Sequence, residues 1–347
     1  MTDANTEMPE RFGHDRGDDR DRGSGKRRGR KGEQLQVPEA DFRSYYGRPI
    51  IKAPVWKNPD VPLYLFLGGL AGTSAGLGAL GAATGRPTLR RTGRLAAAGG
   101  AVGGTAFLVH DLHRPSRFLH MLRVLKPTSP LSVGTWILSP FATFAAATAA
   151  SEVTGLVRRA GDASGVVAAV IGPALATYTA VLFSNTAVPT WHEAHRELPI
   201  VFAGSAAAAG GGMGLVGSSV RDNLPAARLA VGGAAVELVA GEVMERRLGL
   251  LGDVYGKGRA GVLMKASKAC LAAGAVGAVL GRRRRWSAAL SGLALMAGSA
   301  LTRFGVFDAG IASANDPAHI VVPQRERIRA RQATNQVDTA PSDRAFA

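Results

Sequence analysis

PLYLFLGGLAGTSAGLGALGAAT (residues 62–84) is a run of apolar and small residues that contains no charge. A helix needs about 20 mostly apolar residues to cross the hydrocarbon core of a bilayer. Similar runs follow along the chain, with polar or basic loops between them, at 95–110, 131–150, 165–188, 198–220, 226–245, 262–280 and 286–303. We therefore expect an all-α polytopic membrane protein with about eight transmembrane helices.

The charge of the chain is segregated between these runs. A net charge of +16 over 347 residues would, on totals alone, be typical of a nucleic-acid-binding protein. Such a protein gathers its cations on one face of a folded domain. Here the cations lie in the two tails and in short loops, where they bracket apolar runs as the flanks of membrane spans do. We expect membrane lipid as the surroundings of a multi-pass protein of the cell membrane, and no nucleic acid as a partner.

Composition also divides the chain into four parts. Residues 1–40 are polar and charged and predict a disordered basic tail. Residues 41–61, here called the interfacial segment, combine aromatics, prolines and cations that suit the membrane surface. The transmembrane domain is expected over 62–310 and a C-terminal tail over 311–347. Within the domain, GGLAGTSAG (68–76) resembles a dinucleotide-binding loop only superficially, because that motif requires a preceding strand, and close helix packing explains these small residues better.

Cysteine and histidine limit the redox groups that the chain holds by itself. Its one cysteine is Cys270, whereas an iron–sulfur cluster takes about four thiolates. Its histidines lie in tails, loops or span ends, and not as the facing pairs that ligate haem within helices. We expect no iron–sulfur cluster, no haem and no metal site in this chain.

An even number of spans places both termini on one side of the membrane, here called the terminal side. That side also carries the loops near 111–130, 189–197 and 246–261, which mix histidines, prolines, aromatics and both charges. Loops on the opposite side are short and basic. Chemistry and partner contact are therefore expected on the terminal side. Lysine and arginine are nearly balanced across the membrane, so the positive-inside rule does not fix the orientation.

The segment HDLHRPSRFLHMLRVLKPTSPLSVGTW (residues 110–136) resembles the NrfD/PsrC family, the membrane subunits of polysulfide-reductase-type molybdoenzyme complexes. Upstream, YYGRPIIKAPVW (45–56) looks like the corresponding segment of actinobacterial-type members. The resemblance covers about residues 42–310. The pattern consists of Asp111, Arg114-Pro115, Arg117-Phe118, Lys126-Pro127, Ser129-Pro130 and Ser132-x-Gly134-x-Trp136.

This resemblance implies a quinone-binding subunit built as two four-helix bundles. It would bind a menaquinone-type quinone and dock an iron–sulfur (ferredoxin-like) electron-transfer subunit. That partner would link the quinone to a molybdopterin catalytic subunit, so the substrate active site would lie outside this chain.

Two acidic positions lead the candidate site residues. Asp111 ends the second run beside Arg114, and an acid at membrane depth is by default a functional hypothesis. The alternative is an Asp that pairs with a neighbouring arginine and pins the loop. Glu237 lies deep in its run without a sequence-local partner, which favours a role in quinone binding or proton transfer. Glu242 lies nearer the terminal side, and Glu245 is interpreted as structural, neutralised by Arg246 and Arg247.

Polar groups within the spans complete the expected quinone pocket, which we place around Asp111 at the terminal-side end of the first bundle. Tyr64, Ser132 and Tyr178 are lesser candidates, and Asn185 is a further polar group; each can bond a quinone or a neighbouring helix. Gly134 is expected to leave space for a quinone ring. Trp136 and Trp191 are interpreted as interface anchors, and Arg303 with Asp308 as a pair closing the pocket. Partner docking is assigned to His120, Lys126, His192, Glu193 and Arg196.

The leading function from sequence is a quinone-reactive membrane subunit of a multi-subunit oxidoreductase. A secondary transporter or proton- or cation-conducting protein is the alternative, because buried acids also bind cations at the midplane of transporters. A purely structural membrane anchor is a third interpretation.

Overall fold

The computed structural model describes residues 50–52, 54–112 and 114–338, and this part of the chain contains helices and no strand. The predicted tail 1–40 and residues 41–49 of the interfacial segment lie outside the described residues. The helices are α1 (Asp60–Ala83), α2 (Pro87–Asp111), α3 (Arg117–Met121), α4 (Pro130–Thr154), α5 (Arg158–Ser184), α6 (Pro189–Glu193), α7 (Leu198–Gly217), α8 (Leu224–Leu248), the 3-10 helix η1 (Gly249–Gly256), α9 (Gly258–Leu280), α10 (Arg285–Asn315) and α11 (Ala318–Asp338).

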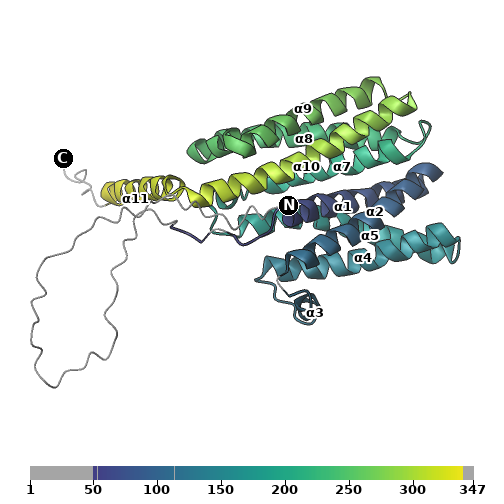
Figure 1. The fold of residues 1–347 in the computed structure, drawn as a ribbon, viewed down its shortest axis with the longest axis horizontal. Helices are drawn as coiled ribbons and strands as arrows, with labels where there is room; N and C mark the ends of the chain where they lie inside the picture. The colour runs from purple at the N-terminus through teal and green to yellow at the C-terminus, as the bar shows by residue number, and fades with distance from the viewer. Residues whose placement is uncertain (1–49, 53, 113, 339–347) are drawn as a thin grey trace, which may run out of the picture. The chain divides into compact units, whose positions relative to one another are not determined.

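Eight long helices of the described domain form two groups of four, as Figure 1 shows. One group consists of α1, α2, α4 and α5, and the other of α7, α8, α9 and α10; α1 packs against α7 where the groups meet. We call the end of the helices at Asp60, Asp111 and Asn315 the terminal end, and the end at Ala83, Thr154 and Leu280 the opposite end. The expected pair of four-helix bundles is thereby confirmed.

Seven of the described helices are long and apolar enough to cross a membrane: α1, α4, α5, α7, α8 with η1, α9 and α10. The eighth helix of the two groups, α2, begins at Pro87 and not near residue 95, so that its first turns contain Arg90 and Arg94. These cations lower its hydropathy. Because α2 runs back along α1, from Gly81 beside Arg90 to Tyr64 beside Gly104, it spans the same depth as α1.

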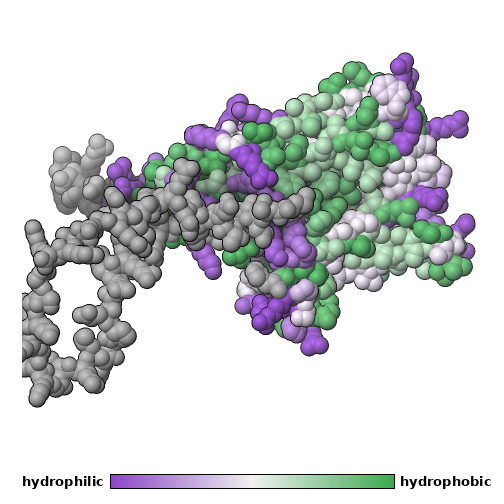
Figure 2. Space-filling view, in the orientation of Figure 1, coloured by the Kyte–Doolittle hydropathy of each residue, from purple (hydrophilic) through white to green (hydrophobic). Residues whose placement is uncertain are grey.

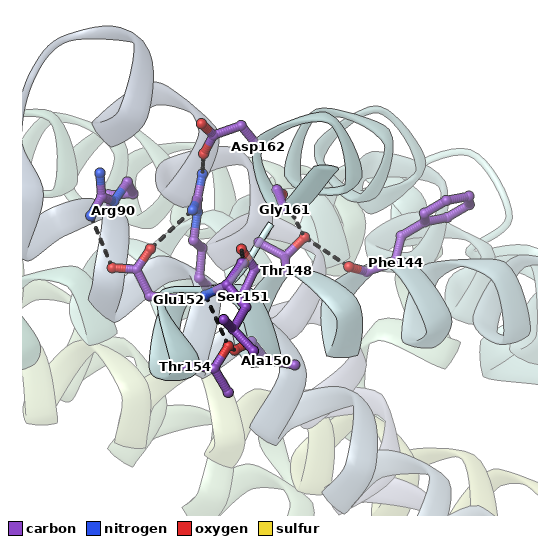
Figure 3. Close-up of polar contacts among 11 residues, drawn as sticks. Arg90, Phe144, Thr148, Ala150, Ser151, Glu152, Thr154, Gly161 and Asp162 are labelled. Carbon is purple, nitrogen blue, oxygen red and sulfur yellow. Dashed lines mark hydrogen bonds and ion pairs between the residues drawn. The ribbon is translucent and has the colours of Figure 1, made fainter. Parts of the chain in front are cut away.

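An ion-pair cluster explains how α2 keeps these arginines between helices. The Arg94 guanidinium bonds Glu152 of α4 at 2.9 Å and Asp162 of α5 at 2.5 Å, and Arg90 bonds the other oxygen of Glu152 at 3.1 Å (Figure 3). Arg94 and Glu152 are both nearly inaccessible, at 6% and 7% side-chain exposure. Buried charges need such partners. The cluster therefore ties three helices of the first bundle together at the opposite end.

Small residues set the distance between helices elsewhere. A Cβ on Gly72 of α1 would overlap the carbonyl oxygen of Gly172 in α5, so neither position accepts a larger residue without a shift of the backbone. Next to it, the Thr73 hydroxyl donates to the Ala206 carbonyl of α7 at 2.8 Å, across the two bundles. In lipid, where apolar burial gives little drive to associate, such close approach and interhelical hydrogen bonds hold helices together.

Hydropathy follows the same axis in the face drawn in Figure 2. Apolar residues cover the flanks of the helices, and polar residues gather towards their two ends. This distribution matches a hydrocarbon layer bordered by two aqueous or headgroup layers. The last spanning helix, α10, continues past the predicted end of its run at residue 303 and ends at Asn315. Helix α11 follows within the predicted C-terminal tail and lies next to α10.

Candidate functional site

Asp111 fastens the interfacial segment to the terminal end of α2. Its carboxylate accepts the backbone N–H of Lys57 at 2.8 Å, and the Lys57 ammonium donates to the His110 carbonyl at 3.1 Å. Nδ1 of His110 lies 2.7 Å from the buried carboxylate of Asp60, the first residue of α1. These contacts agree with the loop-pinning interpretation of Asp111. Arg114 follows on an exposed turn.

Trp56 of the interfacial segment stacks on an aromatic cluster inside the terminal end. Its ring centroid lies 5.5 Å from that of Trp191, which in turn lies 4.3 Å from Phe183. Trp191 is fully buried and donates its indole N–H to the Val306 carbonyl at 2.8 Å. The prediction of Trp191 as an interface anchor is therefore wrong: the glycine at 310 leaves α10 open to its ring, since a Cβ there would overlap the indole.

Ser132 holds the loop that precedes α4. Its hydroxyl accepts the Lys126 N–H at 2.9 Å and lies 3.1 Å from the Val124 carbonyl, to which it donates. The Trp136 indole N–H reaches the same carbonyl at 3.4 Å, and its ring stays exposed as an interface anchor would be. Ser132 is thus engaged by the backbone, and the loop that it fixes carries Lys126 and the prolines after it.

Directly behind this loop lies a cavity of about 530 Å³, here called the α4–α5 cavity. It opens between the start of α4 and the end of α5, at the terminal end of the first bundle. Its wall is mainly apolar, with a tyrosine and an asparagine as the longest polar groups. The lining residues are Pro127, Thr128, Pro130, Val133, Tyr178, Val181, Ser184 and Asn185.

Tyr178 is positioned in this cavity by Gly134. A Cβ on Gly134 would overlap the phenol ring, so the glycine of the Ser132-x-Gly134-x-Trp136 pattern makes room for Tyr178. We expected Gly134 to leave space for a quinone ring, and the ring that fills this space belongs to the chain itself. Within the described residues, no hydrogen bond is formed by the Tyr178 hydroxyl or by the Asn185 side-chain amide, so both are available to a ligand.

The structure therefore separates the expected pocket residues. Tyr178 lines the α4–α5 cavity, whereas Asp111 and Ser132 contact backbone elsewhere and do not line it. Tyr64 is buried in α1 near Gly104 of α2. Only Tyr178 and Asn185, among the candidate polar groups, share one cavity with the family-like loop.

Glu237 marks a second polar centre, inside the second bundle. The residue is buried at 3% exposure, and within the described residues neither carboxylate oxygen has a hydrogen-bond partner. Ser205 of α7, Thr302 and Arg303 of α10 lie around it. Arg303 is fully buried, donates to the Phe202 carbonyl at 3.0 Å and stacks 3.6 Å from the centroid of the Phe202 ring.

Two pairs of buried hydroxyls adjoin this centre. The Ser205 and Ser299 oxygens are 2.8 Å apart, and those of Ser267 and Thr302 are 2.6 Å apart. None of these hydroxyls was selected from the sequence. The sequence signals that pointed here were Glu237 itself and Arg303, a cation within the apolar part of α10.

Other expectations for the second bundle require correction. Arg303 and Asp308 do not pair with each other, because Asp308 bonds Arg259 at 3.2 Å near the terminal end. Glu245 is neutralised by Lys268 at 2.9 Å and not by its arginine neighbours. Glu242, half-exposed, pairs with Arg246 at 2.8 Å and lies 3.5 Å from Lys268. Unlike Glu237, it faces outward with its charge already compensated.

The residues assigned to partner docking lie at the terminal end. His120, Lys126, His192 and Arg196 are exposed there. Glu193 is half-buried, and its carboxylate forms an ion pair with Arg327 of α11 at 3.3 Å. No group of three or more His, Cys, Asp or Glu side chains with metal-site geometry occurs in the described part of the chain.

Comparison with known proteins is consistent with this architecture. Residues 51–232 match the family described as polysulphide reductase, NrfD. No curated protein matches the sequence. The match covers just over half of the chain: the whole first bundle, α7 and the first part of α8, including the α4–α5 cavity. The chain therefore belongs to the NrfD family of polysulphide reductases, multi-pass membrane subunits of oxidoreductase complexes.

Proposed function

We propose that this chain is the quinone-binding subunit of its complex and passes electrons between a menaquinone-type quinone and an iron–sulfur partner. The α4–α5 cavity carries this proposal. It lies beside the most family-like loop of the sequence, at the end of the bundle where the docking residues are exposed.

The residues of the cavity suit a quinone. Its volume of about 530 Å³ falls in the range of small-molecule pockets, and such pockets combine apolar walls with a few polar groups that set orientation. Val133, Val181 and the prolines supply flat apolar contact. The Tyr178 hydroxyl and the Asn185 amide supply donors for the two carbonyl oxygens of a ring between them. A quinone bound there supplies two-electron, two-proton redox chemistry.

The docking loop explains how electrons would leave the cavity. Lys126 is exposed and directly precedes Pro127 and Thr128, which line the cavity. A partner held by the cations of this loop would therefore sit next to the ligand, which is what electron transfer over a short distance requires. The proposed partner is a ferredoxin-like subunit that in turn contacts a molybdopterin catalytic subunit.

Glu237 is proposed to exchange protons within the second bundle. An acid buried at membrane depth is by default a functional hypothesis, and the proton relays of pumps and transporters use such acids. Arg303 and the hydroxyls of Ser205 and Thr302 surround this carboxylate and could exchange a proton with it. This observation also supports the alternative function, a proton- or cation-conducting protein without quinone.

The test compares two buried tyrosines. Tyr178→Phe removes the hydroxyl while keeping the ring against Gly134. It should lower quinone-dependent turnover of the assembled complex about two- to tenfold, because the loss of one hydrogen bond costs about 0.5–1.5 kcal/mol. Tyr64→Phe is the matched control, because Tyr64 is buried in the same bundle outside the cavity. Its turnover should stay at the parental rate.

The reverse result, with Tyr64→Phe slow and Tyr178→Phe normal, would move the quinone to α1 and α2. Copurification of partner subunits distinguishes the proposed function from the alternative, a proton- or cation-conducting protein. A chain that purifies from membranes without an iron–sulfur and a molybdopterin subunit, and that moves protons by itself, would be a transporter.

A further inference from the structure

A second cavity of the described domain lies between the two bundles and has a different lining from the α4–α5 cavity, although Thr177 of the one and Tyr178 of the other are neighbours in α5. It measures about 850 Å³ and runs between α1 and α5 on one side and α7 and α8 on the other. We call it the inter-bundle groove. Its lining is mostly Gly, Ala, Leu and Pro, with Thr73, Thr84 and Thr177 as the only hydroxyl groups among the lining residues.

These hydroxyls do not offer donors to a ligand. Thr73 donates to the Ala206 carbonyl at 2.8 Å, Thr84 to the Leu80 carbonyl at 2.7 Å and Thr177 to the Pro173 carbonyl at 2.9 Å. A hydroxyl has one proton to give. The walls of the groove therefore suit a hydrocarbon chain better than a polar head group.

Along α1 the groove is about as long as one leaflet, and on α5 and α7 its lining extends past the middle of the spans, to Thr177 and Ala203. Along α1 its lining begins at Gly72, near the middle of the span, and ends at Thr84, twelve residues later at the opposite end. At 1.5 Å per residue this is about 18 Å, and one leaflet is about half of the roughly 30 Å hydrocarbon core. An acyl chain entering from the opposite end would thus reach the middle of the bilayer while it lies within the groove.

Two guanidinium groups stand where the groove reaches that end. Arg86 follows α1 and Arg228 is an exposed residue in the first turns of α8, so both lie at headgroup depth. Arg86 uses one amino group to donate to the Arg221 carbonyl at 3.2 Å, while its buried Nε has no partner among the described residues. No acidic residue lines the groove. Arginine binds phosphate oxygens through such paired donors.

We propose that the inter-bundle groove binds an anionic glycerophospholipid from the leaflet at the opposite end, with one acyl chain between the bundles and its phosphate between Arg86 and Arg228. The lipid would fill the seam along which α1 and α5 meet α7 and α8. It would act as a structural ligand of the paired bundles, separate from the quinone.

Gly76 gives a direct test, because it lines the groove and a Cβ placed on it meets no atom within 4 Å. Gly76→Leu fills the groove without displacing the backbone. Gly232→Leu is the matched control: Gly232 is exposed on α8, its added Cβ also meets no atom within 4 Å, and it does not line the groove. For the charges, Arg228→Gln is compared with Arg91→Gln, an exposed arginine of α2 at the same end.

The experiment is native mass spectrometry of the full chain purified in mild detergent, with phosphatidylglycerol or phosphatidylcholine added back. The parent should retain one phosphatidylglycerol in at least fivefold preference to phosphatidylcholine, and so should both controls. Gly76→Leu should lose retention of either lipid at least tenfold. Arg228→Gln should keep an acyl lipid but lose the preference for the anionic one.

Three results would overturn the proposal. They are equal retention of the two lipids by the parent, unchanged retention by Gly76→Leu, and a quinone as the molecule that Gly76→Leu displaces. Arg228→Gln keeps the test decisive if Gly76→Leu does not fold, because an exposed arginine is replaced there without any change in packing.

Discussion

Arg94 is the residue whose replacement tests most sharply how α2 is held in the first bundle. Arg94→Leu removes a buried cation that bonds Glu152 at 2.9 Å and Asp162 at 2.5 Å. Without Arg94, the half-exposed Asp162 can contact solvent or headgroups instead. The loss in free energy of unfolding therefore comes mainly from the buried Glu152. Breaking a buried ion pair by removing one partner costs about 3–5 kcal/mol. Because Arg90 still bonds Glu152 at 3.1 Å, we expect a cost at or just below the lower end of that range, about 2–3 kcal/mol.

The double variant Arg94→Leu/Glu152→Leu separates charge from packing. With both charges gone, Arg90 also loses its partner, but its side chain is 39% exposed and can turn to solvent or headgroups. An apolar pair of similar volume in place of a buried ion pair is often neutral. We expect the double variant to recover at least about 1.5 kcal/mol relative to the sum of the two single variants. The assay is the free energy of unfolding in detergent micelles, measured by titration with a denaturing detergent.

A single variant within about 0.5 kcal/mol of the parent, which is the range of an ordinary surface substitution, would refute the role of the cluster. Strict additivity in the double variant would refute the coupling. Either result would leave the charged start of α2 without an explanation and remove the reason to expect that this helix crosses with its arginines neutralised.

Three further predictions concern topology and the acids. Ser116→Cys and Ser164→Cys should react with an impermeant thiol reagent from opposite sides of the membrane, since one lies in the α2–α3 turn and the other near the start of α5; labelling from one side contradicts eight crossings. Asp111→Asn keeps an acceptor for the Lys57 N–H and lies outside the α4–α5 cavity, so the variant should assemble and turn over quinone at close to the parental rate; a loss of about tenfold would instead assign proton transfer to Asp111. Glu237→Gln should lower turnover about tenfold at unchanged assembly, and a parental rate would exclude proton exchange there.

Most of the fold was predictable because lipid imposes one simple demand. Every spanning segment must satisfy its backbone within a helix and present apolar side chains, so hydropathy marks the spans. The start of α2 could not be predicted in this way, for a physical reason. Arg90 and Arg94 are compensated by Glu152 and Asp162 from other helices, and hydropathy scores a residue without its tertiary partners.

The candidate site was predictable in its parts and not in its assembly. The loop around Lys126 and the polar group at Tyr178 were both selected from sequence, but their meeting in one cavity depends on how α4 and α5 pack. Gly134 was selected as leaving space for a quinone ring, and only the packing of α4 against α5 shows that the Tyr178 ring fills this space. Trp191 was misplaced because a loop tryptophan next to charges is typical of an interface residue, while its burial depends on a glycine of α10, far away in the chain.

Photo-crosslinking with an azido-menaquinone analogue in the assembled complex tests the central claim most directly. The label should be found by peptide mapping within residues 127–133 or 178–185, the two segments that line the α4–α5 cavity, and excess unmodified menaquinone should suppress it. Tyr178→Phe should weaken the labelling at both segments together. Labelling confined to α1 and the end of α2, around Tyr64 and Asp111, or labelling that menaquinone does not compete, would contradict the placement of the quinone in this cavity.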